Sequence, residues 1–196
     1  IDIVASLYGR KFQIELLKKN LKNVFIPVTV GGAIKSIEDC NNLFENGADK
    51  VTINTHALQF DEKIIYQIAK NYGSQSLVLN IEAKKVGNDW LCYSDNGRCP
   101  SSRNILEWIK IGQDLGVGEI LLQSVDKDGS KKGFDLELYK KVIKFIKVPL
   151  IIASGAGKLE HISDLLKIHK PEGICLSTMF YDDIKNISLV KRLINE

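Results

Sequence analysis

The sequence predicts an α/β fold, a (β/α)8 TIM-type barrel made of two half-barrel repeats, with seven strands present and the first β/α unit missing. Three observations predict it. Short β-rich apolar runs alternate with longer stretches of helical period. The runs are apolar on both faces, which is typical of parallel strands covered by helices. The chain also resembles itself at a shift of 122 residues. We expect residues 1–196 to form a single domain.

Seven short apolar segments are predicted strands. They are Ile1–Ala5, Phe25–Val30, Lys50–Asn54, Ser76–Ala83, Glu119–Val125, Pro149–Ala153 and Gly173–Ser177. Six amphipathic segments between them are predicted helices, namely Phe12–Leu21, Ile37–Asn46, Leu58–Asn71, Ile105–Leu115, Leu136–Ile146 and Leu159–Ile168. Strands that alternate with helices in this way favour a parallel sheet. Seven such units are one short of the eight that close a barrel.

The chain has no initiator Met and opens inside the predicted strand Ile1–Ala5, so we expect further residues before it in the full protein. A seven-stranded piece would leave strand edges unpaired, and such edges pair with other chains. We therefore predict that residues 1–196 alone associate or dissolve poorly. A monodisperse monomer that melts cooperatively, seen by sedimentation and thermal unfolding, would contradict this expectation.

The internal repeat covers a helix, a strand and a second helix without a gap. A shift of 122 residues places Phe12–Lys19 on Phe134–Lys141. The same shift aligns four more identical pairs, Lys22 with Lys144, Pro27 with Pro149, Glu38 with Glu160 and Leu43 with Leu165. Lysines could recur by helical composition alone, but a proline that opens the equivalent strand in each half could not. Self-similarity at so long a period predicts two halves of several β/α units each.

The segment Lys84–Ser102 has turn pairs on both sides of a short apolar run. Gly87-Asn88-Asp89 precedes Trp90–Tyr93, and Asp95-Asn96-Gly97 follows it. Such pairs predict a small hairpin, inserted after the strand Ser76–Ala83. It follows the carboxyl end of a strand, where barrels carry their functional loops.

Composition excludes several classes of function. The net charge of +3 comes from lysines spread along predicted helix faces, which indicates a solvated surface rather than a nucleic-acid interface. The four cysteines have no metal-ligand or disulfide spacing and fit a reducing, cytoplasmic compartment. No apolar run reaches the roughly 20 residues needed to cross a membrane. We expect no metal ion and no cofactor.

Two short glycine-rich turns end equivalent strands of the two halves, and each is followed one strand later by polar residues. The predicted phosphate-binding residues are Gly31, Gly32, Asn54 and Thr55 in the first half and Gly155, Ala156, Gly157, Ser177 and Thr178 in the second. Glycines let the backbone approach an anion, and free N–H groups can hold it. Plain tight turns are the alternative. Two sets of donors across one barrel mouth predict a substrate with two phosphates.

Several carboxylates could act at this mouth. Glu82 lies in an otherwise apolar strand, where burial is costly unless the side chain points into the mouth. An ion pair with Lys84 is the alternative. Asp2 lies in the first predicted strand, and Asp126 and Asp128 lie in one loop, where bracing the loop is the alternative role. We predict Glu82, Asp2 and Asp126 as the catalytic residues.

Four stretches together resemble one family. They are Gly47–Thr55, Gly73-Ser74-Gln75, Gly118–Leu122 and Asp126–Asp135. The family is the cyclase subunit of imidazole glycerol phosphate synthase, in histidine biosynthesis, and the resemblance runs from Asp2 to the C-terminus. It implies a glutaminase partner on the amino-terminal face of the barrel, which sends ammonia through its centre. Lys50 and Glu119 match two charged gate residues of the family, and Asp49 and Gln75 match partner-facing positions.

The resemblance also implies a reaction. Ammonia would attack a bis-phosphorylated ribulosyl-formimino aminoimidazole carboxamide ribonucleotide, and cleavage with ring closure would give imidazole glycerol phosphate. The family uses two aspartates as its general acid and base. The one on the first strand would precede Ile1, and the one on the fifth strand is Glu82 here, about one methylene longer.

Other departures resemble a paralogous group associated with amidation of surface-polysaccharide sugars. Ala33 replaces a glycine of one turn, Ser154–Gly157 is one glycine short, and the loop Ser6–Lys11 looks like that group. Three hypotheses follow: an ammonia-dependent cyclase, a barrel that supplies ammonia for sugar amidation, and a glutaminase-activating conduit without chemistry of its own. Assay with ammonium salt and the ribonucleotide separates the first from the others.

Overall fold

The computed structural model describes residues 1–10, 12–181 and 186–195, and its centre is one curled sheet. The strands are β1 (Thr29–Gly31), β2 (Lys50–Ile53), β3 (Leu77–Val86), β4 (Asp89–Ser94), β5 (Cys99–Asn104), β6 (Glu119–Ser124), β7 (Leu150–Ala153) and β8 (Gly173–Cys175). Six of them run parallel in the order β1-β2-β3-β6-β7-β8. This parallel, helix-covered arrangement confirms the predicted fold class. Within the described ranges the sheet stays open, because β1 and β8 do not pair with each other.

One strand prediction near the N-terminus is wrong, and a second is confirmed only at its end. Residues 3–9 form turns, and the predicted strand Ile1–Ala5 makes one backbone contact with the sheet, from the Asp2 N–H to the Gly31 carbonyl at 2.8 Å. A single bond does not make a ladder. The predicted strand Phe25–Val30 shrinks to β1, and Phe25 is 93% exposed, because residues 25–27 find no neighbouring strand. Lys11, the last residue of the loop that resembles the paralogous group, lies outside the described residues.

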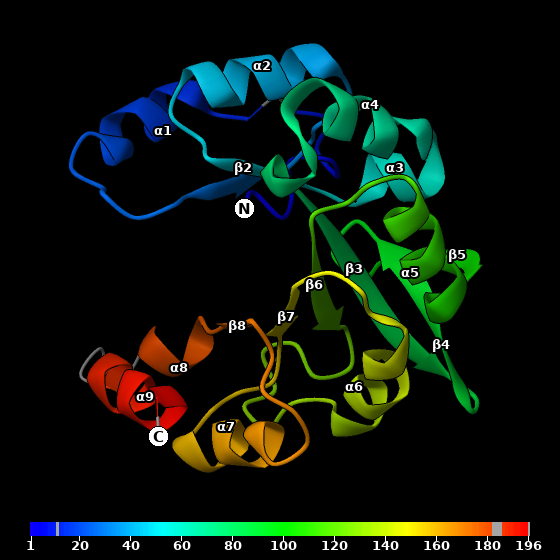
Figure 1. The fold of residues 1–196 in the computed structure, drawn as a ribbon, viewed down its shortest axis with the longest axis vertical. Helices are drawn as coiled ribbons and strands as arrows, with labels where there is room; N and C mark the ends of the chain where they lie inside the picture. The colour runs from blue at the N-terminus through cyan, green and yellow to red at the C-terminus, as the bar shows by residue number, and fades with distance from the viewer. Residues whose placement is uncertain (11, 182–185, 196) are drawn as a thin grey trace.

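Helices and short 3₁₀ turns connect the strands. They are α1 (Ile14–Leu21), α2 (Ile37–Glu45), α3 (Thr55–Gln59), α4 (Lys63–Tyr72), η1 (Ser74–Ser76), α5 (Ile105–Asp114), α6 (Leu136–Val142), η2 (Ile143–Phe145), α7 (Leu159–Leu166), α8 (Thr178–Tyr181) and α9 (Asn186–Asn195). Side chains fix several starts: Ser36 and Asp39 form a capping box at α2, and Asp135 accepts from the Leu138 N–H at α6. Figure 1 shows the helices outside the curved sheet, with the open side between α1 and α8.

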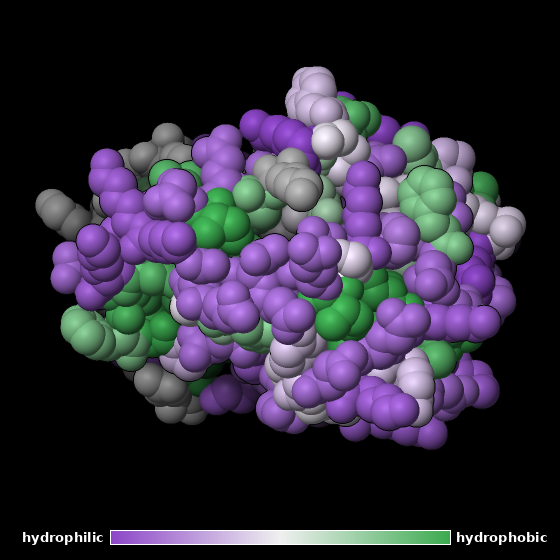
Figure 2. Space-filling model, turned by 90° about the horizontal axis from the view of Figure 1, so that it is seen from above, coloured by the Kyte–Doolittle hydropathy of each residue, from purple (hydrophilic) through white to green (hydrophobic). Residues whose placement is uncertain are grey.

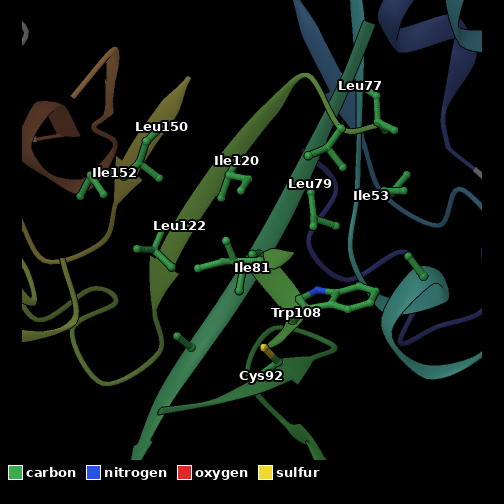
Figure 3. Packing of buried hydrophobic residues seen from close by; sticks show 14 of the residues in the cluster. Ile53, Leu77, Leu79, Ile81, Cys92, Trp108, Ile120, Leu122, Leu150 and Ile152 are labelled. Atoms are coloured by element: carbon green, nitrogen blue, oxygen red, sulfur yellow. The ribbon is translucent and has the colours of Figure 1, made fainter. Parts of the chain in front are cut away.

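The main hydrophobic core lies between the sheet and these helices. Leu77, Leu79 and Ile81 of β3 alternate along the strand and point to it, together with Ile120 of β6 and Trp108 of α5. Figure 3 shows these side chains gathered on one side of the sheet. The other side of β3 faces the interior of the curl, where Val78 and Leu121 belong to a separate small cluster. The period of two therefore separates the packing face from the face that can hold a ligand.

The repeat seen in the sequence is also a repeat of structure. The same shift of 122 residues places Ile14, where α1 begins, on Leu136, where α6 begins. It places Ile37, where α2 begins, on Leu159, where α7 begins. Strands β1 and β2 fall on β7 and β8 in the same way, within one residue. The two halves are therefore built from equivalent elements in the same order.

The predicted hairpin is present and extends the sheet. β3 continues past its parallel partners and pairs antiparallel with β4, and β4 pairs antiparallel with β5. Residues 95–98 connect β4 to β5, and Asp95, Asn96 and Gly97 have φ of 51°, 59° and 74°, the left-handed values that occur in tight turns. Ser94 at the base of this turn is fully buried, while Asn96 at its tip is exposed. The hairpin therefore has a fixed base and a tip at the surface.

The surface agrees with the charge pattern of the sequence. Figure 2 shows the face that lies uppermost in Figure 1, over α1, α2 and α4, and it is mostly hydrophilic with separate hydrophobic areas. Among the described residues no helix is long and apolar enough to cross a membrane.

Candidate functional site

Three cavities lie in a row at the carboxyl ends of the parallel strands. The first, of about 180 Å³, is lined by Gly32, Asn54, Thr55 and Glu82 among others. The middle one shares Glu82 and Asn96 with the first. The third shares Gln123, Asp128 and Ser154 with the middle one and is further lined by Gly155, Ala156, Ser177 and Thr178. The two glycine turns therefore lie on either side of one mouth, and Glu82 lies between them.

Glu82 belongs to β3 and lies on its inner face, where it pairs with Gln123 of β6. One carboxylate oxygen accepts the Gly97 N–H at 2.7 Å. Burial raises the pKa of Glu82 above its ordinary value, and like charges on Asp95 and Asp128 add to that effect; hydrogen bonds from Gly97 and Asn54 oppose it. The predicted alternative, an ion pair with Lys84, is absent among the described residues, because the Lys84 ammonium lies over the Tyr93 ring instead.

The first cavity brings together most of the residues predicted for the first half. Asn54 directly follows β2 and donates from Nδ2 to the Tyr93 carbonyl at 3.4 Å. Thr55 begins α3, and its hydroxyl lies 3.3 Å from an Asp95 carboxylate oxygen. Asp2 lines the same cavity and forms an ion pair with Arg10 at 3.0 Å. The Asp2 carboxylate therefore has a cationic partner inside the N-terminal turns.

Close backbone approach explains the glycines of both turns. Gly32 has φ of 128°, and a Cβ there would lie 2.5 Å from the Asp2 carbonyl oxygen. Gly155 has φ of 98°, and a Cβ would lie 2.2 Å from the Gly133 carbonyl oxygen. Gly31 is different: it does not line the three cavities, and a Cβ there would meet the Thr52 side chain at 2.2 Å. Gly31 thus serves packing between β1 and β2.

In the second half, the third cavity contains Gly155, Ala156, Ser177 and Thr178, as the sequence predicts. Gly157 does not line it, and its N–H donates to His161 Nδ1 at 3.1 Å. That N–H is consequently not available to a ligand in this arrangement. Lys131, which no motif in the sequence singled out, adds a cation to the wall of this cavity.

Of the two loop aspartates, Asp128 rather than Asp126 lines the mouth. Asp126 is exposed, and its carboxylate accepts the Lys85 N–H at 2.8 Å, which ties the loop to the far part of β3. This is the bracing role that the sequence left open. Asp128 lines the middle and third cavities and accepts the Ser154 hydroxyl at 3.2 Å.

The predicted gate and partner-facing residues lie at the opposite, amino-terminal ends of the strands. Lys50 begins β2 and Glu119 begins β6, and their side chains form an ion pair across β3. Asp49 accepts the Val28 N–H at 2.8 Å, and Gln75 donates to the Tyr72 carbonyl at 3.0 Å; both are exposed. All four residues therefore share the end of the sheet that lies away from Glu82.

The hairpin tip also lines the mouth, which the sequence alone did not predict. Asp95 and Asn96 line the first cavity, and Gly97 lines the middle one. The turn signal at Asp95-Asn96-Gly97 located the hairpin but gave no direction for it. Thr52 and Asn80 also line the first cavity from β2 and β3, and spacing by two from Asn54 and Glu82 could have identified them.

Among the described residues, no group of three or more His, Cys, Asp or Glu side chains is placed to hold a metal ion. His56 lines the first cavity and stacks on Phe60, with ring centroids 5.7 Å apart. The mouth carries carboxylates, hydroxyls, amides and backbone N–H groups together with the Lys35 and Lys131 ammonium groups, which suit anion binding and proton transfer.

The chain matches known proteins along its length. The model of a family described as histidine biosynthesis protein matches residues 1–186. A Legionella pneumophila protein named imidazole glycerol phosphate synthase subunit HisF is 47% identical over 164 residues, which cover 83% of this chain and 77% of the relative. Proteins with the same name from Sulfurisphaera tokodaii and from a Hydrogenobaculum species are each 38% identical over 100% of this chain and 78% of their own length.

Proposed function

Because the chain belongs to the histidine biosynthesis protein family, whose model matches residues 1–186, we propose that it acts as an imidazole glycerol phosphate synthase cyclase subunit. Its substrates are ammonia and a bis-phosphorylated ribulosyl-formimino aminoimidazole carboxamide ribonucleotide. Its products are imidazole glycerol phosphate and the aminoimidazole carboxamide ribonucleotide.

One observation carries the proposal: two glycine-turn cavities flank one carboxylate. We assign the first phosphate to the cavity with Gly32, Asn54 and Thr55. We assign the second to the cavity with Gly155, Ala156, Ser177 and Thr178. The first set of residues is called the first cradle, and the second set is called the second cradle. A substrate with a phosphate at each end would span the middle cavity and present its reacting atoms to Glu82.

Glu82 is the proposed acid–base group. Its raised pKa supports this role, since a carboxyl group that titrates closer to neutral pH exchanges a proton more readily under working conditions. Ammonia adds through its lone pair and must then lose a proton, and a leaving nitrogen must gain one. Glu82 could accept the first proton and donate it at the second step. Asp128, which also lines the middle cavity, is better situated than Asp126 to assist.

The amino-terminal end of the sheet is the proposed docking face for a glutaminase subunit. The Lys50–Glu119 ion pair lies at the start of the inner sheet face; the exposed Asp49 directly precedes Lys50, and the exposed Gln75 lies just before β3. Ammonia released by the partner would enter past this pair and travel along the inner face toward Glu82. The ion pair would thus regulate entry at one end while the chemistry occurs at the other.

The test of the function is turnover of the ribonucleotide with ammonium salt, followed by imidazole glycerol phosphate formation. We expect turnover by the protein in its full-length form, and its loss when Glu82 is neutralised. Glutaminase stimulation without any conversion of the ribonucleotide would contradict the proposal. That outcome would instead favour a role in which the barrel passes ammonia to a different acceptor.

Removal of the Lys50 charge should affect turnover with glutamine more than turnover with ammonium. In Lys50→Met, glutamine-dependent turnover should fall about tenfold, while ammonium-dependent turnover stays within about twofold, because only the former depends on coupling to a partner. The measurement is a side-by-side assay with glutamine plus the glutaminase and with ammonium chloride.

A double variant, Lys50→Met with Glu119→Leu, is the matched control. Lys50→Met alone leaves the half-buried Glu119 carboxylate without its cation and should lower stability, whereas the double variant should recover stability by removing both charges. If stability and glutamine-dependent turnover recover together, the gate assignment is wrong and the ion pair is structural.

A further inference from the structure

The tip of the β4–β5 hairpin covers part of the mouth. Its turn residues contact side chains at the carboxyl ends of three neighbouring strands, β2, β3 and β6. Asp95 contacts Thr55, which follows β2. Gly97 donates to Glu82 of β3, and a Cβ at Gly97 would lie 2.6 Å from the side chain of Val125, which follows β6. The tip therefore lies across the first cavity and the middle one.

Two reciprocal contacts hold the tip on Thr55. The Thr55 hydroxyl lies 3.3 Å from a carboxylate oxygen of Asp95, and the Asp95 N–H donates to the same hydroxyl at 3.2 Å. Thr55 is the hydroxyl that the first cradle offers to a phosphate. Asp95 thus brings a negatively charged oxygen to the position where a phosphate oxygen would accept from Thr55.

We infer that Asp95 competes with the substrate phosphate for Thr55, so that a phosphate must displace the hairpin tip to occupy the first cradle. The inference rests on the proposed function, since it assumes that this cradle takes a phosphate. Two anionic groups cannot share one hydroxyl donor at close range without strong repulsion. The fully buried Ser94, whose hydroxyl accepts from Gln59 Nε2 at 2.9 Å, holds the base of the hairpin and leaves the tip as the part that moves.

Displacement of the tip would also act on Glu82. Gly97 lies two residues after Asp95 in the same turn, and its backbone N–H donates to the Glu82 carboxylate. Other charged or titratable groups around Glu82 are Asp128 from the loop after β6, and Asp2, Lys35 and His56 on the wall of the first cavity. Binding of phosphate would therefore release the Glu82 carboxylate from its hydrogen bond with Gly97. Because Asp95 competes for Thr55, it is a specificity-determining residue for the first cradle.

The test is titration of inorganic phosphate into wild type and into Asp95→Asn, by calorimetry and by NMR of the Gly97 amide. The asparagine keeps the shape of the side chain and loses its charge, so phosphate should bind about five- to tenfold more tightly. The Gly97 amide resonance should shift on phosphate binding, because its acceptor changes. In steady-state assays the same variant should lower KM for the ribonucleotide, and its acid limb of kcat/KM should move to lower pH, since Asp95 raises the pKa of Glu82.

A charge-swap variant, Asp95→Asn with Asn96→Asp, separates competition from general repulsion. It keeps the net charge of the tip and moves the carboxylate off Thr55, so it should bind phosphate nearly as tightly as Asp95→Asn does. Equal affinity in wild type and Asp95→Asn, or wild-type affinity in the swap, overturns the inference and leaves the proposed function intact. Absence of phosphate binding in every variant overturns the first cradle and the inference together.

Discussion

Replacement of Glu82 by glutamine is expected to lower ammonium-dependent turnover by about 10²- to 10⁴-fold, which is the usual contribution of a positioned acid–base group. Glutamine keeps the length of the side chain and an oxygen that can accept the Gly97 N–H. It cannot accept or donate the catalytic proton. The measurement is kcat for imidazole glycerol phosphate formation at saturating ammonium and ribonucleotide.

The same substitution should not destabilise the fold. Burial raises the pKa of Glu82 in the folded protein, so the folded state binds this proton more tightly than the unfolded state. The stability that Glu82 contributes is therefore complete below the unfolded pKa and is lost as pH rises through the folded pKa. At pH 7 to 8 the neutral glutamine variant should be at least as stable as wild type in urea unfolding. At low pH the free energy of unfolding of the wild type should increase relative to that of the variant.

Glu82→Asp is the matched control for the activity. It keeps the charge, shortens the reach by one methylene, and should retain more turnover than the glutamine variant. As pH is lowered, the kcat/KM of the wild type should begin to fall at a higher pH than it would with an ordinary carboxyl group, because the pKa of Glu82 is raised. This acid limb should be absent in Glu82→Gln. Wild-type turnover by Glu82→Gln would remove Glu82 from the chemistry.

Gly155→Ala is expected to cost about 3 kcal/mol of stability, because it combines an unfavourable backbone conformation with a steric clash. Gly155 has φ of 98°, and a new Cβ would lie 2.2 Å from the Gly133 carbonyl oxygen, which belongs to backbone and cannot rotate away. The Gly133 N–H donates to the Gly155 carbonyl at 2.8 Å, so the two segments are also tied together. Urea unfolding measures the cost.

Gly87→Ala provides the comparison. Gly87 also has positive φ, 63°, but a Cβ there has nothing within 4 Å. Its substitution should cost only about 1 kcal/mol, from the backbone conformation alone. If the two variants lose equal stability, the close approach at Gly155 is not a constraint. Where Gly155→Ala still folds, KM for the ribonucleotide should rise more than kcat falls, since the second cradle is altered.

Local sequence signals predicted the fold well where burial was strong. Strands such as β3 and β6 are buried on both faces, so their apolar composition was sufficient to identify them. The failure at Ile1–Ala5 has a physical reason: apolar and β-branched residues form a strand only when a neighbour supplies hydrogen bonds, and here one such bond exists. Whether a segment at the edge of a sheet forms a strand depends on a neighbouring strand, which amino-acid composition does not reveal.

The candidate site was predictable to a similar extent. Positions at strand ends, such as Asn54 and Ser177, could be assigned to the mouth because parallel strands bring their carboxyl ends together. The distinction between Asp126 and Asp128 could not be made, since both lie in one loop and its path decides which side chain turns inward. The contact between the hairpin tip and Glu82 joins residues from separate turns, and only the three-dimensional path of the hairpin reveals it.

The duplication of elements has a consequence for how a two-ended molecule would lie in the mouth. Equivalent strands and turns of the two halves carry the two cradles, so the two cradles offer an anion similar backbone and hydroxyl groups. A ligand with a phosphate at each end would then find two opposite orientations of similar energy, only one of which is productive. The β4–β5 hairpin follows β3 alone and brings Asp95 to one cradle only. That asymmetry distinguishes the two ends and so sets the direction in which such a ligand binds.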